Sequence, residues 1–189
     1  MSPIIQQVTP EEIAFFTQKA EEKIAAEGWH GRNKEQKKQN FVSCWLTEEA
    51  FKKLLIAHHA FFRHRALYVG DAAGAGLDFE IKRGDTWVSV GIRSIGPESA
   101  FKWKSVAYPE DRFLQEPEKI PDCVVACTVE GTAVTFFGII DKGTLLAELA
   151  RSERRRSRTN QEYFRTVPLG MFSGEKLVSF LRETAEQRE

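Results

Sequence analysis

The most regular alternation of hydrophobic and polar residues in this chain runs from residue 77 to residue 95. It predicts a β-hairpin with a first strand over Leu77–Lys82, a turn at Arg83-Gly84-Asp85 and a second strand over Thr86–Ile95. Glycine in the turn supports this interpretation, because a tight reversal of the chain favours it.

The predicted hairpin brings charged residues to one face. In the second strand Ser89, Gly91 and Arg93 alternate with hydrophobic residues, with the period of two expected of a half-buried strand. In the first strand Asp78 and Glu80 share a face. Carboxylates beside a cation can hold a hydrated metal ion and a phosphate. An ordinary charged face turned to solvent has the same pattern, so both interpretations stay open.

Helical spacing of hydrophobic residues predicts two helices before the hairpin. The first begins at Thr9-Pro10-Glu11-Glu12, where Thr9 and Glu12 can form a capping box, and ends near Gly28. The polar, basic residues 29–39 are interpreted as a linker or an exposed helix start. The second helix runs roughly from Gln39 to Phe62. His58, His59 and His64 are placed at its end, where histidines interact favourably with the helix dipole.

Glu48 stands out in the second helix. At 100° per residue it falls on the arc that carries Cys44, Trp45 and Phe51. A carboxylate on a hydrophobic arc costs free energy unless it is paired. Glu48 is therefore either a buried acid facing a metal or a cation, or a residue at the edge of the arc that reaches water.

The second half of the chain predicts a mixed α/β (α+β) protein. Two hydrophobic strands, Cys123–Val129 and Ala133–Ile140, are expected to be buried on both faces, and Asp141 is expected to cap a helix through Ala150. Tyr163–Val167 is interpreted as an edge strand, and the last helix covers residues 173–186. We predict a single domain over residues 1–189, with a helical part at 9–62 and an α/β core at about 40–170.

Composition narrows the class of protein further. The chain has 189 residues and a formal net charge of +0, so a surface that binds a polyanion must be local. The first residues lack the pattern of a signal peptide, and no hydrophobic run approaches the ~20 residues of a membrane span. The three cysteines are odd in number and lack zinc-type spacing. A reduced, cytoplasmic protein without a membrane partner is expected.

Three segments, taken in chain order, resemble the restriction-endonuclease-like PD-(D/E)XK superfamily. Residues 45–51 (WLTEEAF) look like a helix segment that carries a glutamate in many members, here Glu48. Leu77-Asp78-Phe79 looks like the hydrophobic-Asp motif of the first strand. Residues 90–94 (VGIRS) fall where hydrophobic-(Asp/Glu)-X-Lys-Ser/Thr belongs. The resemblance covers roughly residues 40 to 170 and implies a mixed central sheet flanked by helices.

The resemblance also implies an activity, the Mg²⁺-dependent hydrolysis of DNA. Glu48, Asp78 and Glu80 would be the metal ligands and catalytic acids, with Arg93 beside them. Two departures weaken this prediction, because Gly91 replaces the second motif carboxylate and Arg93 replaces the catalytic lysine. Hydrolysis of this kind needs clustered hard oxygen ligands, and arginine does not exchange a proton near neutral pH. Impaired or altered catalysis is expected, with Glu80 as the candidate replacement carboxylate.

Nucleic acid is the expected partner, and DNA the expected kind. Residues 96–113 interleave basic and aromatic residues, and residues 151–158 contain five arginines. The predicted nucleic-acid-binding residues are Arg93, Ser94, Lys102, Lys104, Arg154, Arg155, Arg156 and Arg158.

A catalytically dead scaffold or protein-interaction module of the same fold is the alternative. A direct Asp78–Arg93 salt bridge would favour it, whereas open carboxylates close together would favour a surviving metal site. Many proteins of this fold are dimers, so a homodimer stays open.

Overall fold

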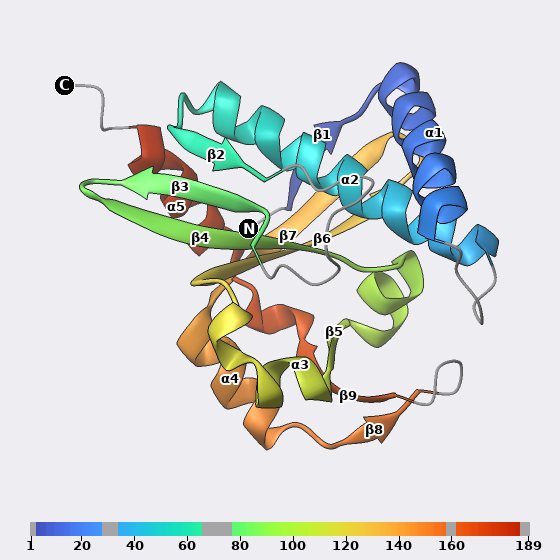
Figure 1. Ribbon diagram of the computed structural model, residues 1–189. Helices are drawn as coiled ribbons and strands as arrows, with labels where there is room; N and C mark the ends of the chain where they lie inside the picture. Colours follow the sequence, from blue (N-terminus) through green and yellow to red (C-terminus); the bar gives the residue numbers. More distant parts are fainter. Residues whose placement is uncertain (1–2, 28–33, 66–76, 158–161, 186–189) are drawn as a thin grey trace.

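A curled, mixed sheet of six strands organises the computed structural model, which describes residues 3–27, 34–65, 77–157 and 162–185 (Figure 1). The strand order is β1-β7-β6-β4-β3-β2. β4 and β6 are parallel and the other neighbours are antiparallel. The strands are β1 (Ile4–Gln7), β2 (Phe62–His64), β3 (Phe79–Arg83), β4 (Thr86–Ser94), β6 (Cys123–Glu130) and β7 (Ala133–Asp141). The predicted mixed α/β (α+β) class is confirmed.

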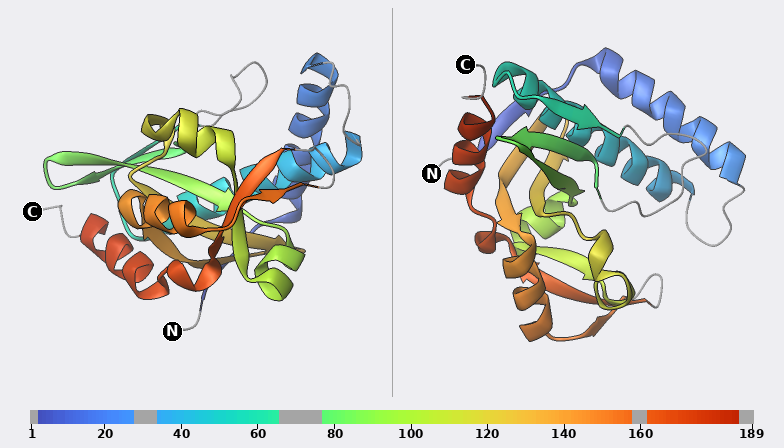
Figure 2. Two further views of the ribbon diagram at one scale, coloured as in Figure 1. Left: turned by 90° about the horizontal axis from the view of Figure 1, so that it is seen from below. Right: turned by 60° about the vertical axis from the view of Figure 1, so that its left-hand side comes forward.

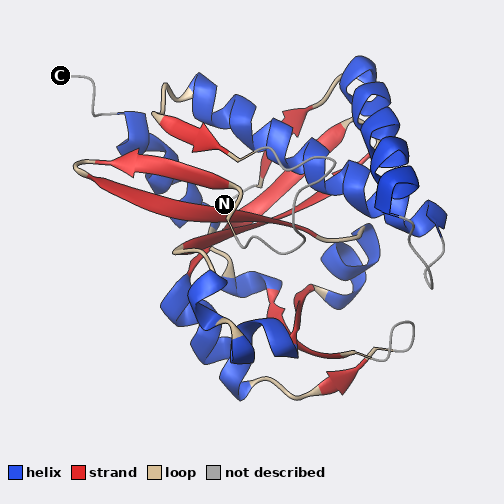
Figure 3. Ribbon diagram, viewed as in Figure 1, coloured by secondary structure: helices blue, strands red, loops and turns tan. Residues whose placement is uncertain are grey.

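Helices α2 (Lys34–Ala57) and α5 (Gly174–Ala185) pack on one face of this sheet, and α1 (Pro10–Glu27) packs on α2. Figure 3 shows these helices in blue above and behind the red strands. Phe51 of α2 lies at the centre of this first core, with its ring 5.3 Å from that of Phe79 and 5.8 Å from that of Phe136. All three side chains are essentially inaccessible to solvent. Burial of this kind is the main stabilising term for the layer.

A second layer covers the other face of the sheet (Figure 2). It contains a small sheet of order β5-β9-β8 together with helices α3 and α4 and three short helical turns. The elements are β5 (Ser105–Pro109), α3 (Glu110–Gln115), α4 (Lys142–Arg151), β8 (Arg155–Arg156), β9 (Tyr163–Pro168), a π-helical turn (Glu98–Trp103) and two 3₁₀ turns (Pro117–Lys119 and Leu169–Met171).

Strand β6 lies between the two cores. Val125 and Cys127 belong to the first core, whereas Val124 and Ala126 belong to the second. The prediction that this strand is buried on both faces is therefore confirmed. No helix in the described ranges is long and apolar enough to cross a bilayer.

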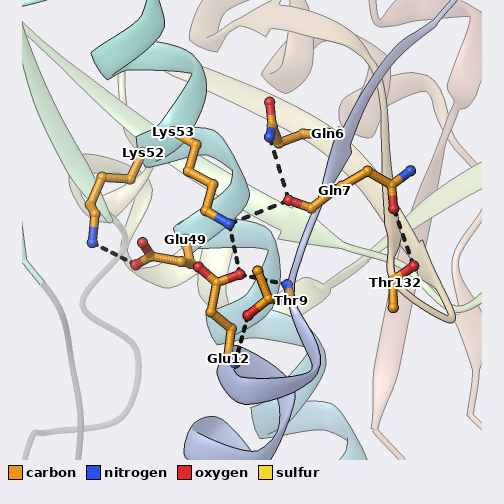
Figure 4. A network of polar contacts seen from close by, with 8 residues as sticks. All are labelled: Gln6, Gln7, Thr9, Glu12, Glu49, Lys52, Lys53 and Thr132. Carbon is orange, nitrogen blue, oxygen red and sulfur yellow. Dashed lines mark hydrogen bonds and ion pairs between the residues drawn. The ribbon is translucent and has the colours of Figure 1, made fainter.

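The start of α1 shows how local chemistry fixes one element (Figure 4). The backbone N–H of Glu12 donates to Thr9 Oγ1 at 3.2 Å, and the backbone N–H of Thr9 donates to Glu12 Oε2 at 2.8 Å. This is the predicted capping box. Lys53 of α2 then joins Glu12 at 2.7 Å and the carbonyl oxygen of Gln7 at 3.3 Å. The same contacts thus tie α1, α2 and β1 together.

Gly138 in β7 allows the second layer to approach the sheet. A Cβ atom at this position would lie 2.4 Å from the carbonyl carbon of Ser173 and 2.5 Å from the carbonyl oxygen of Phe172. Ile139 and Ser173 exchange backbone hydrogen bonds of 3.1 and 3.0 Å next to it. Only glycine leaves room for this backbone contact.

Most predicted elements are confirmed, with three corrections. The hairpin forms over β3 and β4, and Asp141 caps α4 by accepting from the backbone N–H of Thr144 at 2.8 Å. The second helix begins at Lys34 and ends at Ala57, so the prediction that it reaches Phe62 is wrong. The prediction of β9 as an edge strand is also wrong, because β9 is central in its sheet. The third correction concerns His64 and is given below.

Candidate functional site

Glu48 of α2 comes close to Asp78 and the segment Gly91–Arg93, which face each other at the open end of the β3–β4 hairpin. Asp78 directly precedes β3, and its backbone N–H donates to the carbonyl oxygen of Val90 at 3.0 Å. Its side-chain Oδ2 accepts from the backbone N–H of Ile92 at 2.6 Å. The aspartate of the first motif therefore binds the backbone of the second, between Gly91 and Arg93.

The charge of Glu48 reaches Asp78. The pKa of Asp78 is raised from 3.8 to about 7, first by burial and then by the negative charge of Glu48, against the lowering effects of the Ile92 N–H, Arg93 and Arg65. Desolvation and a neighbouring carboxylate both disfavour the ionised form. Asp78 can therefore gain or lose a proton near neutral pH.

Glu48 is buried and paired. Its side chain is 13% exposed, and its Oε2 lies 3.1 Å from Nε2 of His64, whose side chain is 14% exposed. Glu48 is therefore a mostly buried acid with a hydrogen-bonding partner rather than a side chain at the edge of the arc that reaches water. The partner is a histidine from β2.

His64 is the residue that sequence reasoning missed. It lies in strand β2 opposite Phe79, and the two rings stack at 4.4 Å with an angle of 6° between their planes. The prediction that His64 sits at the end of a helix is wrong, because α2 ends at Ala57 and the chain turns back as a strand. The alternation of Phe62, Arg63 and His64 was the available signal, but three residues are too short a run to identify a strand.

Arg93 turns toward the second layer. Its Nη2 donates to the carbonyl oxygen of Ala107 at 2.7 Å, and its guanidinium lies 5.1 Å from the centre of the Tyr108 ring. Within the described ranges, Arg93 forms no ion pair with Asp78. The salt bridge that would have favoured a closed scaffold is therefore not formed. The buried hydroxyl of Tyr108 has no hydrogen-bond partner in the described structure, and burial raises its pKa to about 12.

Two cysteines border the same region. Cys127 is fully buried, and its thiol donates to the carbonyl oxygen of Arg93 at 3.7 Å. Burial of the thiol, and next the negative charge of Glu48, raise the pKa of Cys44 to about 11, although the residue as a whole retains exposed surface. Both thiols therefore stay protonated at neutral pH, which makes them poor nucleophiles.

The described residues do not supply the ligand set that Mg²⁺ requires. Glu80 is turned outward, with its carboxylate 3.8 Å from Arg63. Of the remaining two carboxylates, Glu48 is occupied by His64 and Asp78 by the N–H of Ile92. In the described part of the chain, no three or more acidic, histidine or cysteine side chains are grouped closely enough to hold a metal ion. Mg²⁺ prefers several hard oxygen ligands in octahedral geometry, so these residues do not fit it.

The predicted nucleic-acid-binding residues lie in three segments. The first is the end of β4, with Arg93 and the last strand residue, Ser94. Lys102 lies in the exposed π-helical turn, 2.9 Å from Glu98, and Lys104 follows that turn. Phe101 and Trp103 of the same turn are 51% and 61% exposed.

The arginines of the third segment have different environments. Arg154 donates to the buried carboxylate of Glu110 and lies 3.6 Å from the centre of the Tyr163 ring. Arg155 and Arg156 form the exposed strand β8, and Arg155 lies 3.8 Å from Glu153. Arg158 lies outside the described residues. Arg154 thus has a structural role that Arg155 lacks.

Comparison of the chain with protein-family models, with curated proteins and with solved structures found no match.

Proposed function

We propose that this chain is a nucleic-acid-binding protein with a restriction-endonuclease-like core, related to PD-(D/E)XK DNA endonucleases, in which metal-dependent hydrolysis is impaired. One observation carries the proposal. Glu48 on α2, Asp78 immediately before β3 and the backbone of segment 90–94 lie close together, as expected if the resemblance holds. The β3–β4 hairpin brings Asp78 beside Gly91 and Ile92, and the packing of α2 on the sheet adds Glu48.

The residues at this point support binding better than catalysis. Gly91 contributes no carboxylate, and one oxygen of Glu48 is already hydrogen-bonded to His64. Arg93 is held in place by the carbonyl oxygen of Ala107, and a guanidinium has further N–H groups that can donate to a phosphate oxygen. Arg93 cannot act as a general acid or base near neutral pH. The role that we propose for Arg93 is therefore to bind the phosphate backbone.

The Glu48–His64 pair also supports the second candidate, a scaffold or protein-interaction module that has lost the chemistry altogether. In such a protein the former site would be filled by internal contacts. The two candidates differ in one measurable property, because a scaffold would not bind nucleic acid at the Arg93 position.

The experiment is a binding titration of labelled DNA by fluorescence anisotropy, in EDTA and in Mg²⁺. We expect Arg93→Ala to weaken binding by roughly 5- to 30-fold at low salt, because one charge-assisted contact contributes about 1–2 kcal/mol. Lys19→Ala on α1, a partly exposed lysine that pairs with Glu22, is the control and should have no effect. Equal affinity of wild type and Arg93→Ala would favour the scaffold. A homodimer, which many proteins of this fold form, is tested by light scattering of the same samples.

A further inference from the structure

The β3–β4 hairpin and strand β2 carry a group of aromatic and cationic side chains that the proposed site does not use. We call this group the hairpin patch, and it consists of Phe61, Arg63, Lys82 and Trp87. Lys82 is the cross-strand partner of Trp87, and its backbone N–H donates to the carbonyl oxygen of Phe61 at 2.9 Å. Phe61 and Trp87 therefore flank Lys82 from opposite sides. Figure 1 shows the hairpin extending away from the rest of the sheet.

The side chains of the hairpin patch hold one another in place. The rings of Phe61 and Trp87 lie 5.7 Å apart at 48°. The guanidinium of Arg63 lies 4.2 Å from the centre of the Trp87 ring, and Lys82 Nζ lies 5.9 Å from that of Phe61. Phe61 is nonetheless 66% exposed, and the side chain of Arg63 is 66% exposed. The rings are thus ordered at the surface, with cations against them.

The hairpin patch and Arg93 lie on the same face of β4. Trp87 and Arg93 are both in β4 and an even number of residues apart, so their side chains leave the same face of the strand. At a rise of about 3.3 Å per residue they are separated by about 20 Å along the strand. Gly91, between them, is buried beneath the second layer, whereas Trp87 retains exposed surface. The hairpin patch is therefore a surface separate from Arg93, and it lies where the hairpin extends beyond the second layer.

We propose that the hairpin patch binds single-stranded nucleic acid, with a base stacked against Phe61 and Trp87 and phosphates paired with Lys82 and Arg63. This inference rests on the proposed function, because it assigns the kind of nucleic acid bound. Every base has a flat face that an aromatic ring can stack on, and a duplex hides those faces. Glu80, 3.8 Å from Arg63, offsets part of the positive charge, and Lys82 adds to it. An ordered aromatic pair flanked by cations suits a ligand that is both flat and anionic.

The test measures the affinity of the full chain for labelled oligothymidylate and oligouridylate of about 12 nucleotides, within the range of known single-strand sites, and for a duplex of equal length. The variants are Phe61→Ala, which removes the ring, and Phe61→Leu, which keeps a hydrophobic side chain without an aromatic face. The matched control is Phe15→Ala on α1, because Phe15 is 49% exposed and also has a lysine, Lys19, 5.9 Å from its ring centre. Thermal unfolding checks that each variant is folded.

We expect both Phe61 variants to weaken single-strand binding by roughly 5- to 150-fold, the range for loss of one stacked base, and Phe15→Ala to change it less than two-fold. Whether the loss is seen with oligothymidylate or with oligouridylate identifies DNA or RNA as the partner. If the protein binds the duplex, and Phe61→Ala binds every oligonucleotide with the affinity of wild type, this inference is overturned and the proposed function stands. Equal single-strand affinities would also be the result if the hairpin patch served a protein partner. Absence of binding to any nucleic acid would overturn both proposals.

Discussion

The carboxylate of Glu48 and the imidazole of His64 form a hydrogen-bonded pair that joins helix α2 to strand β2. Oε2 of Glu48 and Nε2 of His64 lie 3.1 Å apart, and both side chains are largely buried. Burying the carboxylate of Glu48 beside Asp78 would cost folding free energy without this partner. The pair therefore stabilises the fold while occupying an acid that the family resemblance would assign to a metal.

The first prediction concerns this pair. A double-mutant cycle with Glu48→Gln and His64→Gln should give a coupling free energy of about 1–3 kcal/mol in urea unfolding at neutral pH, as expected of contacting buried groups. The exposed ion pair of Lys102 and Glu98 provides the comparison and should give less than about 0.5 kcal/mol. Additive effects of Glu48→Gln and His64→Gln would show that the contact contributes nothing to stability.

The second prediction concerns the pH dependence of stability at Asp78. Its pKa is about 7 in the folded protein and near 3.8 in the unfolded chain, so the folded state keeps a proton that the unfolded state has lost. Raising the pH from about 4 to about 7 therefore lowers the free energy of unfolding, by up to about 4 kcal/mol from this group. Asp78→Asn cannot ionise and should lack that loss.

Urea unfolding of wild type and Asp78→Asn at several pH values between about 4 and 8 measures this difference. Asp85→Asn, at the exposed hairpin turn, is the control and should follow wild type. Parallel pH profiles of wild type and Asp78→Asn would contradict the prediction.

The third prediction concerns metal binding. Because the described donors do not fit Mg²⁺, calorimetric titration of Mg²⁺ or Mn²⁺ should give no saturable heat in the millimolar range, and Asp78→Ala should behave like wild type. Titration of the same metal solution into EDTA verifies the sensitivity of the measurement. Saturable binding that disappears in Asp78→Ala would show that Asp78 holds an ion after all, and nuclease assays would then be warranted.

The hairpin and the start of α1 could be predicted from the sequence because their signals are local. Alternation at Val88, Val90 and Ile92 reports the face of β4 directly, and the Thr9–Glu12 capping box depends on residues three apart. The parallel pairing of β4 with β6 and the partner of Glu48 could not be predicted in this way. Both depend on contacts between distant segments, and neither leaves a periodic pattern.

The fourth prediction separates two neighbouring arginines. Arg154 and Arg165 both donate to the buried carboxylate of Glu110, and Arg165 also donates to the carbonyl oxygen of Ser152 at 2.6 Å. Arg154→Ala should therefore lower the Tm by about 3–6 °C, whereas Arg155→Ala should leave it within about 1 °C. DNA binding separates the two variants differently, because we expect only Arg155→Ala to weaken the affinity for DNA without lowering the Tm. Equal Tm values for the two variants would remove the structural role of Arg154.

The fifth prediction concerns Gly138. Gly138→Ala places a methyl group against the backbone of Phe172 and Ser173, and the strain should lower the free energy of unfolding by about 1–3 kcal/mol. Gly170→Ala is the matched control, because nothing lies within 4 Å of its added Cβ, and it should change stability by less than about 0.5 kcal/mol. Urea unfolding of both variants decides the matter, and equal stabilities would mean that the backbone at Ser173 can move away.

The pairing of β1 with β7 has a consequence for synthesis on the ribosome. Ile4 pairs with Phe136, so the strand made first must wait for a partner made about 130 residues later. At 5–20 residues per second that delay is on the order of ten seconds. During this time α1 and α2 can already associate, because their contacts are close in sequence. Strand β1 still lacks its partner β7. A nascent chain stalled before Ala133 should therefore expose β1 to proteases while the two helices are protected.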